Sequence, residues 1–289
     1  MIDGKRVVAF TPYGREVTVS ILAEYMRREH ERGVLDEWWL CLNTDPDQVK
    51  DLIYGYRLAS KHPWIKAVNR PDGLPRLTPK QRNTGYFYRY MTDPDTVYVR
   101  FDDDIVYLHD DALTRLVRKR IQLSHSTLCT FAHIWNNAIC SWYGQQHGVI
   151  PLEYGRVEQP FCMDPMGWAN GQFAVKIHNL LLDHAETGTA HELYLYQDVP
   201  LAPQQQFSVS CFAAVGDVYA GLETPGVLVP DEEEHWHTVH GPRKLNLGNV
   251  IIGDALVSHL TFMNQRQAVL DPSTGILDRY RKLSVKLTK

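Results

Sequence analysis

The stretch Asp93–Leu108 reads DPDTVYVRFDDDIVYL, and its middle part largely determines the fold that we predict. Thr96–Phe101 (TVYVRF) is rich in β-branched and aromatic residues, a composition typical of a buried strand. This strand leads directly into Asp102–Asp104 and then into Ile105–Leu108, which is again apolar. Three adjacent carboxylates at a buried strand end repel one another and lose hydration, so their placement is costly without a compensating cation.

The aspartate triplet predicts a site for a divalent metal ion. If the chain stays extended, Asp102 and Asp104 point to one side and Asp103 to the other, because side chains alternate along a strand. Two carboxylates on one side are suitable oxygen ligands for Mg²⁺ or Mn²⁺. The carboxyl ends of parallel strands are also where open α/β sheets bind their ligands. The alternative is a solvated acidic turn that caps the next helix.

Strand and helix patterns alternate on both sides of this stretch. The apolar spacing predicts the strands Arg6–Thr11, Glu37–Leu42 and Trp64–Val68, and the helices Val17–Arg32, Arg82–Tyr90 and Ala112–Gln122. This alternation predicts an α/β fold with a mainly parallel sheet flanked by helices.

The second half of the chain has a less regular pattern. We expect an amphipathic helix over Gly171–His184 and a basic helix over Ile276–Lys289. Phe207–Val215 is apolar throughout, and its periodicity does not choose between a buried strand and a helix.

Composition excludes several classes of protein. The 289 residues suffice for one large domain, and 44% hydrophobic with 22% charged residues is typical of a folded globule. The 30 basic and 34 acidic residues give a net charge of −4, which argues against a protein that coats nucleic-acid phosphates. No run approaches ~18 consecutive apolar residues, so we expect no membrane span. The apolar stretch near the start is too short for a signal peptide.

The cysteines indicate the compartment. There are five, an odd number, widely spaced and without a CxxC pair: Cys41, Cys129, Cys140, Cys162 and Cys211. We therefore expect buried free thiols in a reducing compartment, and a cytoplasmic protein.

Four segments resemble one enzyme class. Asp93–Leu108 resembles the metal-binding DxD segment of glycosyltransferases with the GT-A fold. Val7–Arg15 (VVAFTPYGR) and Trp39–Asp45 (WLCLNTD) resemble the nucleotide-side strands of bacterial and viral glycosyltransferase-like proteins. Gly253–Arg266 (GDALVSHLTFMNQR) resembles the segment in which many such enzymes supply a histidine as a third metal ligand.

The resemblance implies a single GT-A-like, Rossmann-like catalytic domain over residues 1–289. Residues 1–122 would form its nucleotide-binding half, and residues 123–289 its acceptor-side half with the metal-ligand segment and the basic tail. The implied activity is a metal-dependent hexosyltransferase that uses a nucleotide-sugar, foremost a UDP-sugar, with Mn²⁺ or Mg²⁺. The acceptor stays open among a glycan, a protein side chain, a lipid-linked sugar and a modified DNA base.

The resemblance also implies roles for individual residues. Asp102, Asp104 and His259 would bind the metal, although Asp102 could instead reach the ribose, and Asp103 would serve the sugar or the fold. Without the resemblance, a lone histidine such as His259 is more often a hydrogen-bonded core residue.

The nucleotide is expected at the ends of the first two strands. Backbone groups there can meet a nucleobase or ribose, and arginines can neutralise a diphosphate; the candidates are Thr11, Pro12, Gly14, Arg15, Asn43, Thr44, Arg82 and Arg89. Ordinary turn chemistry and surface solvation are the alternative explanations for these residues.

An inverting enzyme also needs a carboxylate base for the acceptor hydroxyl. Asp198, in HELYLYQDVP, is our first candidate, with Glu192 and Asp217 in reserve. Amides and aromatic rings that could line the acceptor or sugar pocket, or instead pack in the core, are Asn136, Asn137, Trp142 and Trp168.

One segment allows a rival interpretation. Asp231–His240 (DEEEHWHTVH) carries His235, His237 and His240 beside carboxylates, which could form a zinc site, a lid over the donor or an ordinary polar loop. For the whole chain, two other functions stay open: a metal-dependent phosphohydrolase on the same aspartates, and a non-catalytic protein that binds nucleotides or carbohydrates.

Overall fold

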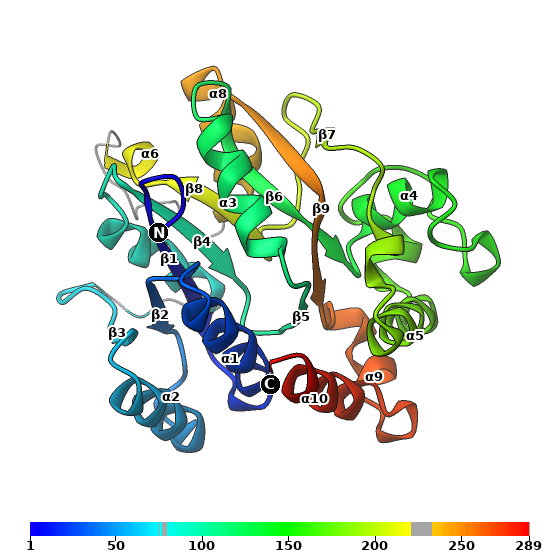
Figure 1. The fold of residues 1–289 in the computed structure, drawn as a ribbon, viewed down its shortest axis with the longest axis horizontal. Coiled ribbons are helices and arrows are strands. Elements are labelled where there is room, and N and C mark those ends of the chain that lie inside the picture. Colours follow the sequence, from blue (N-terminus) through cyan, green and yellow to red (C-terminus); the bar gives the residue numbers. More distant parts are fainter. Residues whose placement is uncertain (75, 77–79, 221–232, 289) are drawn as a thin grey trace.

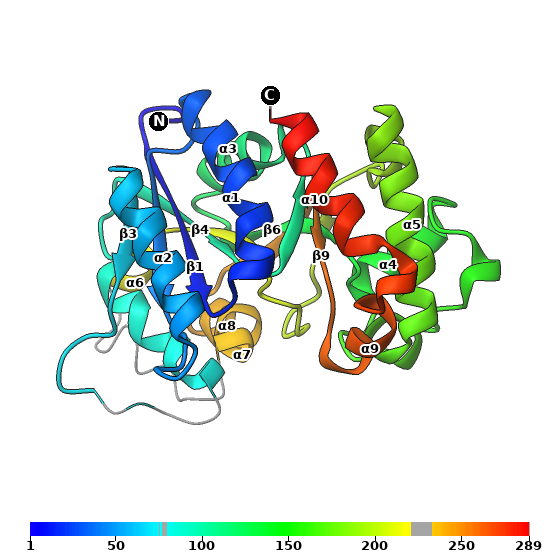
Figure 2. The same ribbon diagram turned by 90° about the horizontal axis from the view of Figure 1, so that it is seen from below.

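The computed structural model describes residues 1–74, 76, 80–220 and 233–288 of the protein. In these residues a nine-stranded sheet has the strand order β3-β2-β1-β4-β8-β6-β9-β5, with β7 pairing with β9. Helices α1 and α10 lie on one side of the sheet and helices α7 and α8 on the other (Figures 1 and 2). None of the described helices is long and apolar enough to span a bilayer.

The first half of the sheet is wholly parallel. β1 (Arg6–Tyr13) lies between β2 (Glu37–Leu42) and β4 (Thr96–Phe101), and β3 (Ile65–Val68) adds to the outer side of β2. The connections are helix α1 (Glu16–Glu31), helix α2 (Val49–Lys61) and the 3₁₀ helix η1 (Lys80–Tyr90). The strands and helices predicted here are confirmed, because strong apolar periodicity and local connections specify such units.

The second half is mixed. β8 (Cys211–Val215) is antiparallel to both β4 and β6 (Thr127–Trp135), so β6 points the same way as β4. β9 (Gly248–His259) is parallel to β6, whereas β5 (Ile105–Leu108) and β7 (Val199–Pro200) run antiparallel to β9. Six of the nine strands therefore share one direction, and the predicted mainly parallel α/β sheet is confirmed. The undecided segment Phe207–Val215 contains a strand because it has hydrogen-bonding partners on both sides.

The remaining helices surround this half of the sheet. They are α3 (Ala112–Gln122), α4 (Ala138–Gln146), α5 (Gly171–Thr187), α6 (Asp217–Ala220), α7 (Glu233–His235), α8 (Gly241–Leu245), α9 (Arg266–Val269) and α10 (Ile276–Leu287). Short 3₁₀ or π turns are η2 (Leu152–Tyr154), η3 (Pro165–Ala169), η4 (Ala190–Leu193), η5 (Trp236–His240), η6 (Met263–Gln265) and η7 (Pro272–Thr274).

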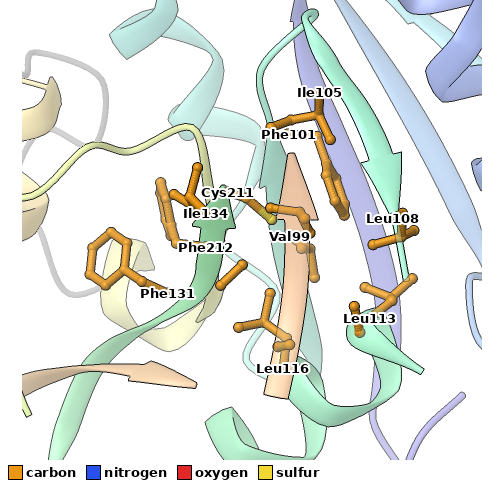
Figure 3. Close-up of a cluster of buried hydrophobic side chains, with 14 of the residues drawn as sticks. Val99, Phe101, Ile105, Leu108, Leu113, Leu116, Phe131, Ile134, Cys211 and Phe212 are labelled. Atoms are coloured by element: carbon orange, nitrogen blue, oxygen red, sulfur yellow. The ribbon is translucent and has the colours of Figure 1, made fainter. Parts of the chain in front are cut away.

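The centre of the sheet is the hydrophobic core. Side chains of β4, β6, β8 and α3, among them Val99, Phe131, Phe212 and Leu116, pack together without solvent contact (Figure 3). All five cysteines are buried and free, as predicted. Tight packing of this kind holds the strand ends in fixed relative positions, which is what a binding site at the sheet edge needs.

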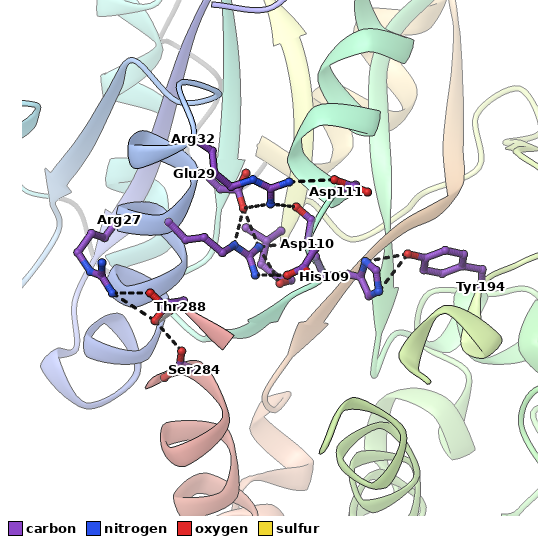
Figure 4. Close-up of polar contacts among 11 residues, drawn as sticks. Arg27, Glu29, Arg32, His109, Asp110, Asp111, Tyr194, Ser284 and Thr288 are labelled. Carbon is purple, nitrogen blue, oxygen red and sulfur yellow. Dashed lines mark hydrogen bonds and ion pairs between the residues drawn. The ribbon is translucent and has the colours of Figure 1, made fainter. Parts of the chain in front are cut away.

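A polar network fastens α1 to the turn after β5. The side chain of Arg28 pairs with the fully buried Glu29 and with Asp110, and Arg32 pairs with Asp111 (Figure 4). Nearby, Arg27 donates to the Thr288 carbonyl oxygen at 3.0 Å, so the end of the basic C-terminal helix is held against α1.

Candidate active site

The site lies where several strands end at one edge of the sheet. β4 ends just before Asp102, β1 ends just before Gly14, and β9 ends at His259. Ile105 pairs directly with His259 across β5 and β9, and the Leu260 amide donates to the Asp104 carbonyl oxygen at 2.9 Å. This register brings the end of β9 to the aspartate turn although 155 residues separate Asp104 from His259.

Asp102, Asp104 and His259 form a group that could hold a metal ion. One ligand atom from each lies within 4.8 Å of the others. Asp104 and His259 are 4% and 5% exposed, and His259 Nε2 lies 3.3 Å from Asp104 Oδ1. The side chain of Asp102 is more open, at 27% exposed. The structure thus brings together the three predicted metal ligands.

The local geometry of the aspartates differs from the prediction. Asp103 and Asp104 form a turn, closed by the Ile105 amide donating to the Asp102 carbonyl oxygen at 3.2 Å, so the expected extended chain is wrong. Asp103 and Asp104 also share one partner, Arg15, instead of lying on opposite sides. Turns of this kind are not visible in the strand-like periodicity of the surrounding residues.

Arg15 is the main counter-charge of the turn. Its Nε donates to Asp103 Oδ1 at 3.1 Å, its Nη2 also bonds Asp103, and Nη2 lies 3.0 Å from Asp104 Oδ2. The Gly14 amide donates to Asp103 Oδ2 at 3.1 Å. Asp103 therefore connects the β1–α1 turn to the end of β4. The positive charge of Arg15 is neutralised by the carboxylates of Asp103 and Asp104.

Burial and charge act oppositely on the acidic groups. Burial raises the pKa of Asp103 to about 6 against the effect of Arg15. For Asp104, burial alone would raise the pKa, but His259 and Arg15 together lower it below the usual range. Burial likewise would lower the pKa of His259, yet the Asp104 carboxylate raises it. The group is consequently a strongly polarised, water-poor cluster of charges.

Arg100 is a site residue that the sequence reasoning missed. Its fully surrounded guanidinium lies 2.8 Å from Asp102 Oδ1 and binds Glu233 in bidentate fashion, at 2.8 and 3.1 Å. It orients Asp102 from the side of α7. A signal was present, since a charged residue within the apolar TVYVRF strand must find partners where it is buried.

Glu234 was also missed. Gln206 Nε2 donates to Glu234 Oε1 at 2.6 Å, and the neighbouring Glu233 binds Arg100. Burial, opposed by the Gln206 hydrogen bond and aided by the charge of Glu233, raises the pKa of Glu234 to about 7. A buried carboxyl group with a raised pKa and charged neighbours is a candidate for proton transfer. Three consecutive glutamates in sequence gave no reason to single out this one.

A polar pocket of about 420 Å³ opens at the end of β2. The predicted nucleotide-binding residues Asn43 and Thr44 line it, together with Arg70, Arg76 and Asn83. Thr44 Oγ1 donates to the Tyr13 carbonyl oxygen at 2.9 Å, and Arg76 Nη2 donates to the Thr44 carbonyl oxygen at 3.0 Å. The pocket therefore adjoins the end of β1.

The other residues predicted to bind the nucleotide, as far as the structure describes them, do not line this pocket. Thr11 is fully buried and its hydroxyl accepts from Trp38 Nε1 at 3.0 Å, while Pro12 is half-buried near the end of β1. Arg82 and Arg89 lie on η1, and the side chain of Arg82 is outside the described residues.

The structure does not bring Asp198 to the aspartate turn. Its Oδ1 accepts from the Gly253 amide at 3.1 Å, and its Oδ2 lies 2.7 Å from Lys119 Nζ. Gly253 precedes His259 by six residues of β9, roughly 15 to 20 Å at ~3.3 Å per residue. Of the reserves, Glu192 lies 3.6 Å from His184, and Asp217 follows the far end of β8.

The histidine-rich segment is placed only in part. Asp231 and Glu232 lie outside the described residues, so the lid hypothesis has no structural description. His237 is fully buried, its two ring nitrogens bonded to Tyr219 Oη and the Glu233 carbonyl oxygen. Among the described residues, the metal-ligand group found is Asp102, Asp104 and His259, so the described part of the segment provides no zinc site.

The candidate acceptor residues have different surroundings. Asn137 caps α4 by accepting from the Cys140 amide at 3.1 Å, and Asn136 is buried at the end of β6. Trp142 is half-buried and packs edge-on against Tyr143. Trp168, on η3, lies next to Phe262 in the loop that follows His259.

Comparison with known proteins gives similarities at low sequence identity. Two structures of glucosyl-3-phosphoglycerate synthase from Mycobacterium tuberculosis, one with Mn²⁺, UDP and glucosyl-3-phosphoglycerate and one with phosphoglyceric acid, match at TM-scores of 0.49 and 0.47. Each is 14% identical and covers 96% of this chain and 80% of its own. A 4-diphosphocytidyl-2C-methyl-D-erythritol synthase from Anaerococcus prevotii matches at 0.31, with 18% identity, over 45% of this chain and 56% of its own.

No protein-family model and no curated protein matches the chain. The structure itself contains a mainly parallel sheet flanked by helices, and paired aspartates where a central strand ends.

Proposed function

We propose that this protein is a metal-dependent glycosyltransferase that transfers a sugar from a UDP-sugar to an acceptor hydroxyl. The observation that carries the proposal is the convergence of Asp102, Asp104 and His259 at the carboxyl edge of the sheet. This edge is where α/β sheets bind nucleotides, and the pocket at Asn43 and Thr44 opens on the same edge.

The three side chains suit a divalent ion. Two carboxylates and an imidazole are ligands that Mn²⁺ accepts, and Mg²⁺ is compatible with the carboxylates. His259 Nδ1 is buried and has no hydrogen-bond partner among the described residues, so one ring nitrogen still has its hydrogen-bonding capacity unused. A bound ion would stabilise the negative charge that develops on the departing diphosphate.

The donor would lie along the ends of β2, β1 and β4. The pocket at the end of β2 holds the nucleoside, with Arg70 and Arg76 on its wall. Two strand spacings, ~10 Å, separate this pocket from the end of β4, a span that a nucleoside diphosphate covers. Arg15 lies between them, at the end of β1, where it orients Asp103 and Asp104.

Glu234 is the residue that we propose as the base. Its carboxylate takes the proton of the acceptor hydroxyl while the acceptor oxygen bonds to the anomeric carbon and the bond to the diphosphate breaks. Gln206 holds the carboxylate, and the Arg100–Glu233 pair connects the same helical segment to Asp102. A base with a pKa near 7 is well matched to this proton transfer at neutral pH.

Calorimetric titration of UDP in the presence of Mn²⁺ tests the proposal. Wild-type protein should bind UDP with Mn²⁺ and much more weakly with EDTA. Asp104→Asn should weaken the Mn²⁺-dependent binding by about 100-fold, since losing a ligand costs at least as much as losing a residue that supports one. Asp254→Asn, which alters a half-exposed aspartate paired with Arg115, is the matched control and should bind normally.

Equal UDP affinity in Asp104→Asn and wild type would refute the assigned metal site. Incubation with UDP-sugars separates the alternative functions. Rapid release of phosphate or sugar in water alone favours a phosphohydrolase, and binding without product across a broad acceptor panel favours a non-catalytic binding protein.

A further inference from the structure

We propose that Trp168 and Phe262 form a stacking subsite for a pyranose ring of the acceptor, so that the acceptor is a carbohydrate. This inference rests on the proposed glycosyltransferase function and adds the acceptor class. Phe262 lies beside His259 and Trp168 lies next to Phe262. Both lie on the β9 side of the metal-ligand group, away from the nucleoside pocket at β2.

The rings of His259, Phe262 and Trp168 are successive neighbours, from the metal-ligand group outward. The centroids of the Phe262 and His259 rings are 4.5 Å apart, and those of Trp168 and Phe262 are 6.4 Å apart. Both Trp168 and Phe262 are partly exposed, and Met263 beyond them is 78% exposed. Figure 1 shows the chain leaving β9 toward α9, close to α5, which follows the Trp168 segment.

A buried glutamine holds both rings in place. Gln265, fully buried, accepts from the Phe262 amide at 3.2 Å and donates to the Gly167 carbonyl oxygen, next to Trp168, also at 3.2 Å. The same Gln265 Oε1 accepts from Asn136 Nδ2 at 2.9 Å. One side chain therefore connects the loop after β9, the η3 turn and the end of β6.

The side chain of Asn136 supports the same loop from the end of β6. The φ of this residue is +63°, in the left-handed region that asparagine adopts more readily than most other non-glycine residues. In this conformation its Nδ2 reaches the Leu260 carbonyl oxygen at 3.1 Å as well as Gln265.

The Trp168 turn is also fixed by close packing. A Cβ atom on Gly167 would lie 2.6 Å from Ala138 Cα, so only glycine allows η3 to approach α4 this closely. The rings are thus presented by a rigid support on two sides. Ordering such side chains before binding avoids an entropic cost that flexible residues would pay on each encounter.

The position favours the acceptor over the donor. Along the sheet, the nucleoside pocket lies at β2, the aspartates follow β4, and the aromatic rings lie near the end of β9, on the other side of β4. A pyranose has an apolar face of C–H bonds that stacks on an aromatic face, while its hydroxyls remain free for hydrogen bonds. A ring stacked here would present a hydroxyl next to the metal-ligand group.

Binding of simple sugars to the protein loaded with Mn²⁺ and UDP tests the inference. The probes are methyl glycosides of glucose, galactose and mannose, followed by tryptophan fluorescence and by saturation-transfer NMR on the sugar C–H protons. At least one glycoside should bind wild-type protein. Trp168→Ala and Phe262→Leu should weaken that binding at least 10-fold, whereas Trp168→Phe, which keeps a ring, should lose less.

Two controls make the result specific. The affinity for Mn²⁺ and UDP should stay within twofold of wild type in the two Trp168 variants, which shows that they fold. Tyr196→Ala removes a highly exposed ring that packs on His147 and should bind the glycoside normally. Comparing methyl with octyl glucoside distinguishes a free glycan from a lipid-linked sugar, because only the latter gains from the alkyl chain.

The inference is overturned if no glycoside binds the loaded wild-type protein, or if both ring variants bind it with wild-type affinity. Either result leaves the glycosyltransferase proposal intact as long as UDP binds with Mn²⁺. If wild-type protein did not bind UDP with Mn²⁺, the proposed function would be refuted, and the proposed subsite with it.

Discussion

The end of β9 and the η5 segment each bury a histidine, and the two histidines have opposite chemistry. His259 faces the Asp104 carboxylate, whereas His237 contacts the Tyr219 hydroxyl at 3.0 Å and the Glu233 carbonyl oxygen at 2.7 Å. Burial lowers the pKa of His237 to about 3, while at His259 the Asp104 carboxylate reverses the effect of burial and raises the pKa. Similar burial thus leads to different protonation, because the partners differ in charge.

The difference also concerns how many partners each ring has. Both nitrogens of His237 are used, so the ring is a saturated part of the core. His259 Nδ1 has no partner among the described residues, and an anionic group lies at Nε2. The hydrogen-bond partners of a buried histidine therefore indicate better than its burial whether it could bind a metal ion.

The most direct test of this comparison replaces each of the two histidines with alanine. His259→Ala should lower Mn²⁺-dependent UDP affinity by about 30- to 100-fold, and it should also lower the unfolding free energy, because it removes a buried side chain that pairs with the Asp104 carboxylate. His237→Ala should leave UDP affinity unchanged and lower the unfolding free energy by about 2–4 kcal/mol, through a cavity and unpaired polar groups. Calorimetry measures the UDP affinity, and urea unfolding measures the unfolding free energy. The comparison would be wrong if UDP affinity fell in His237→Ala and stayed unchanged in His259→Ala.

Glu234 tests whether the η5 region contributes to the reaction as well as to the core. Glu234→Gln should lower turnover by about 100- to 1,000-fold without changing affinity for Mn²⁺ and UDP. Because a base must be deprotonated, wild-type turnover should fall as the pH drops below about 7. The residual turnover of the variant should not show this fall.

The matched control for that experiment is Asp198→Asn, an equal loss of charge at the residue bound to Lys119 and Gly253. It should retain wild-type turnover. Activity that survives in Glu234→Gln but disappears in Asp198→Asn would return the base to the residue predicted from sequence.

A further prediction concerns the pH dependence of stability. His237 has a folded-state pKa of about 3, below its usual 6.5, so the unfolded chain binds the extra proton first. Its contribution is complete above pH 6.5 and is lost as the pH falls toward 3, with a slope of up to about 1.4 kcal/mol per pH unit. His237→Gln should flatten this decline, measured by urea unfolding at pH 7, 6, 5 and 4.

The decline should persist in part, since burial also lowers the pKa values of His133 and His178, to about 3 and about 4. If the unfolding free energy fell equally steeply with decreasing pH in variant and wild type, the His237 ring would take up its proton at the same pH in the folded protein as in the unfolded chain.

Sequence reasoning succeeded where neighbours along the chain determine the outcome. The parallel units of the first half and the aspartates after β4 follow from apolar periodicity and short connections. It did not foresee the partners of Asp198, which come from α3 and the middle of β9, and it overlooked Arg100 and Glu234. Arg100 finds Glu233 across 133 residues, a contact that no local pattern encodes.

By itself, the sequence determined the strand–helix alternation of the first half and the concentration of carboxylates where a buried strand ends, because both depend on residues only a few positions apart. The tertiary structure alone decided which distant groups meet those carboxylates. The pairing of Ile105 with His259 supplies the imidazole, and the loop beyond it carries Phe262 to Trp168. Strand register and packing are collective properties of the whole sheet, so they place such partners only once the chain has folded.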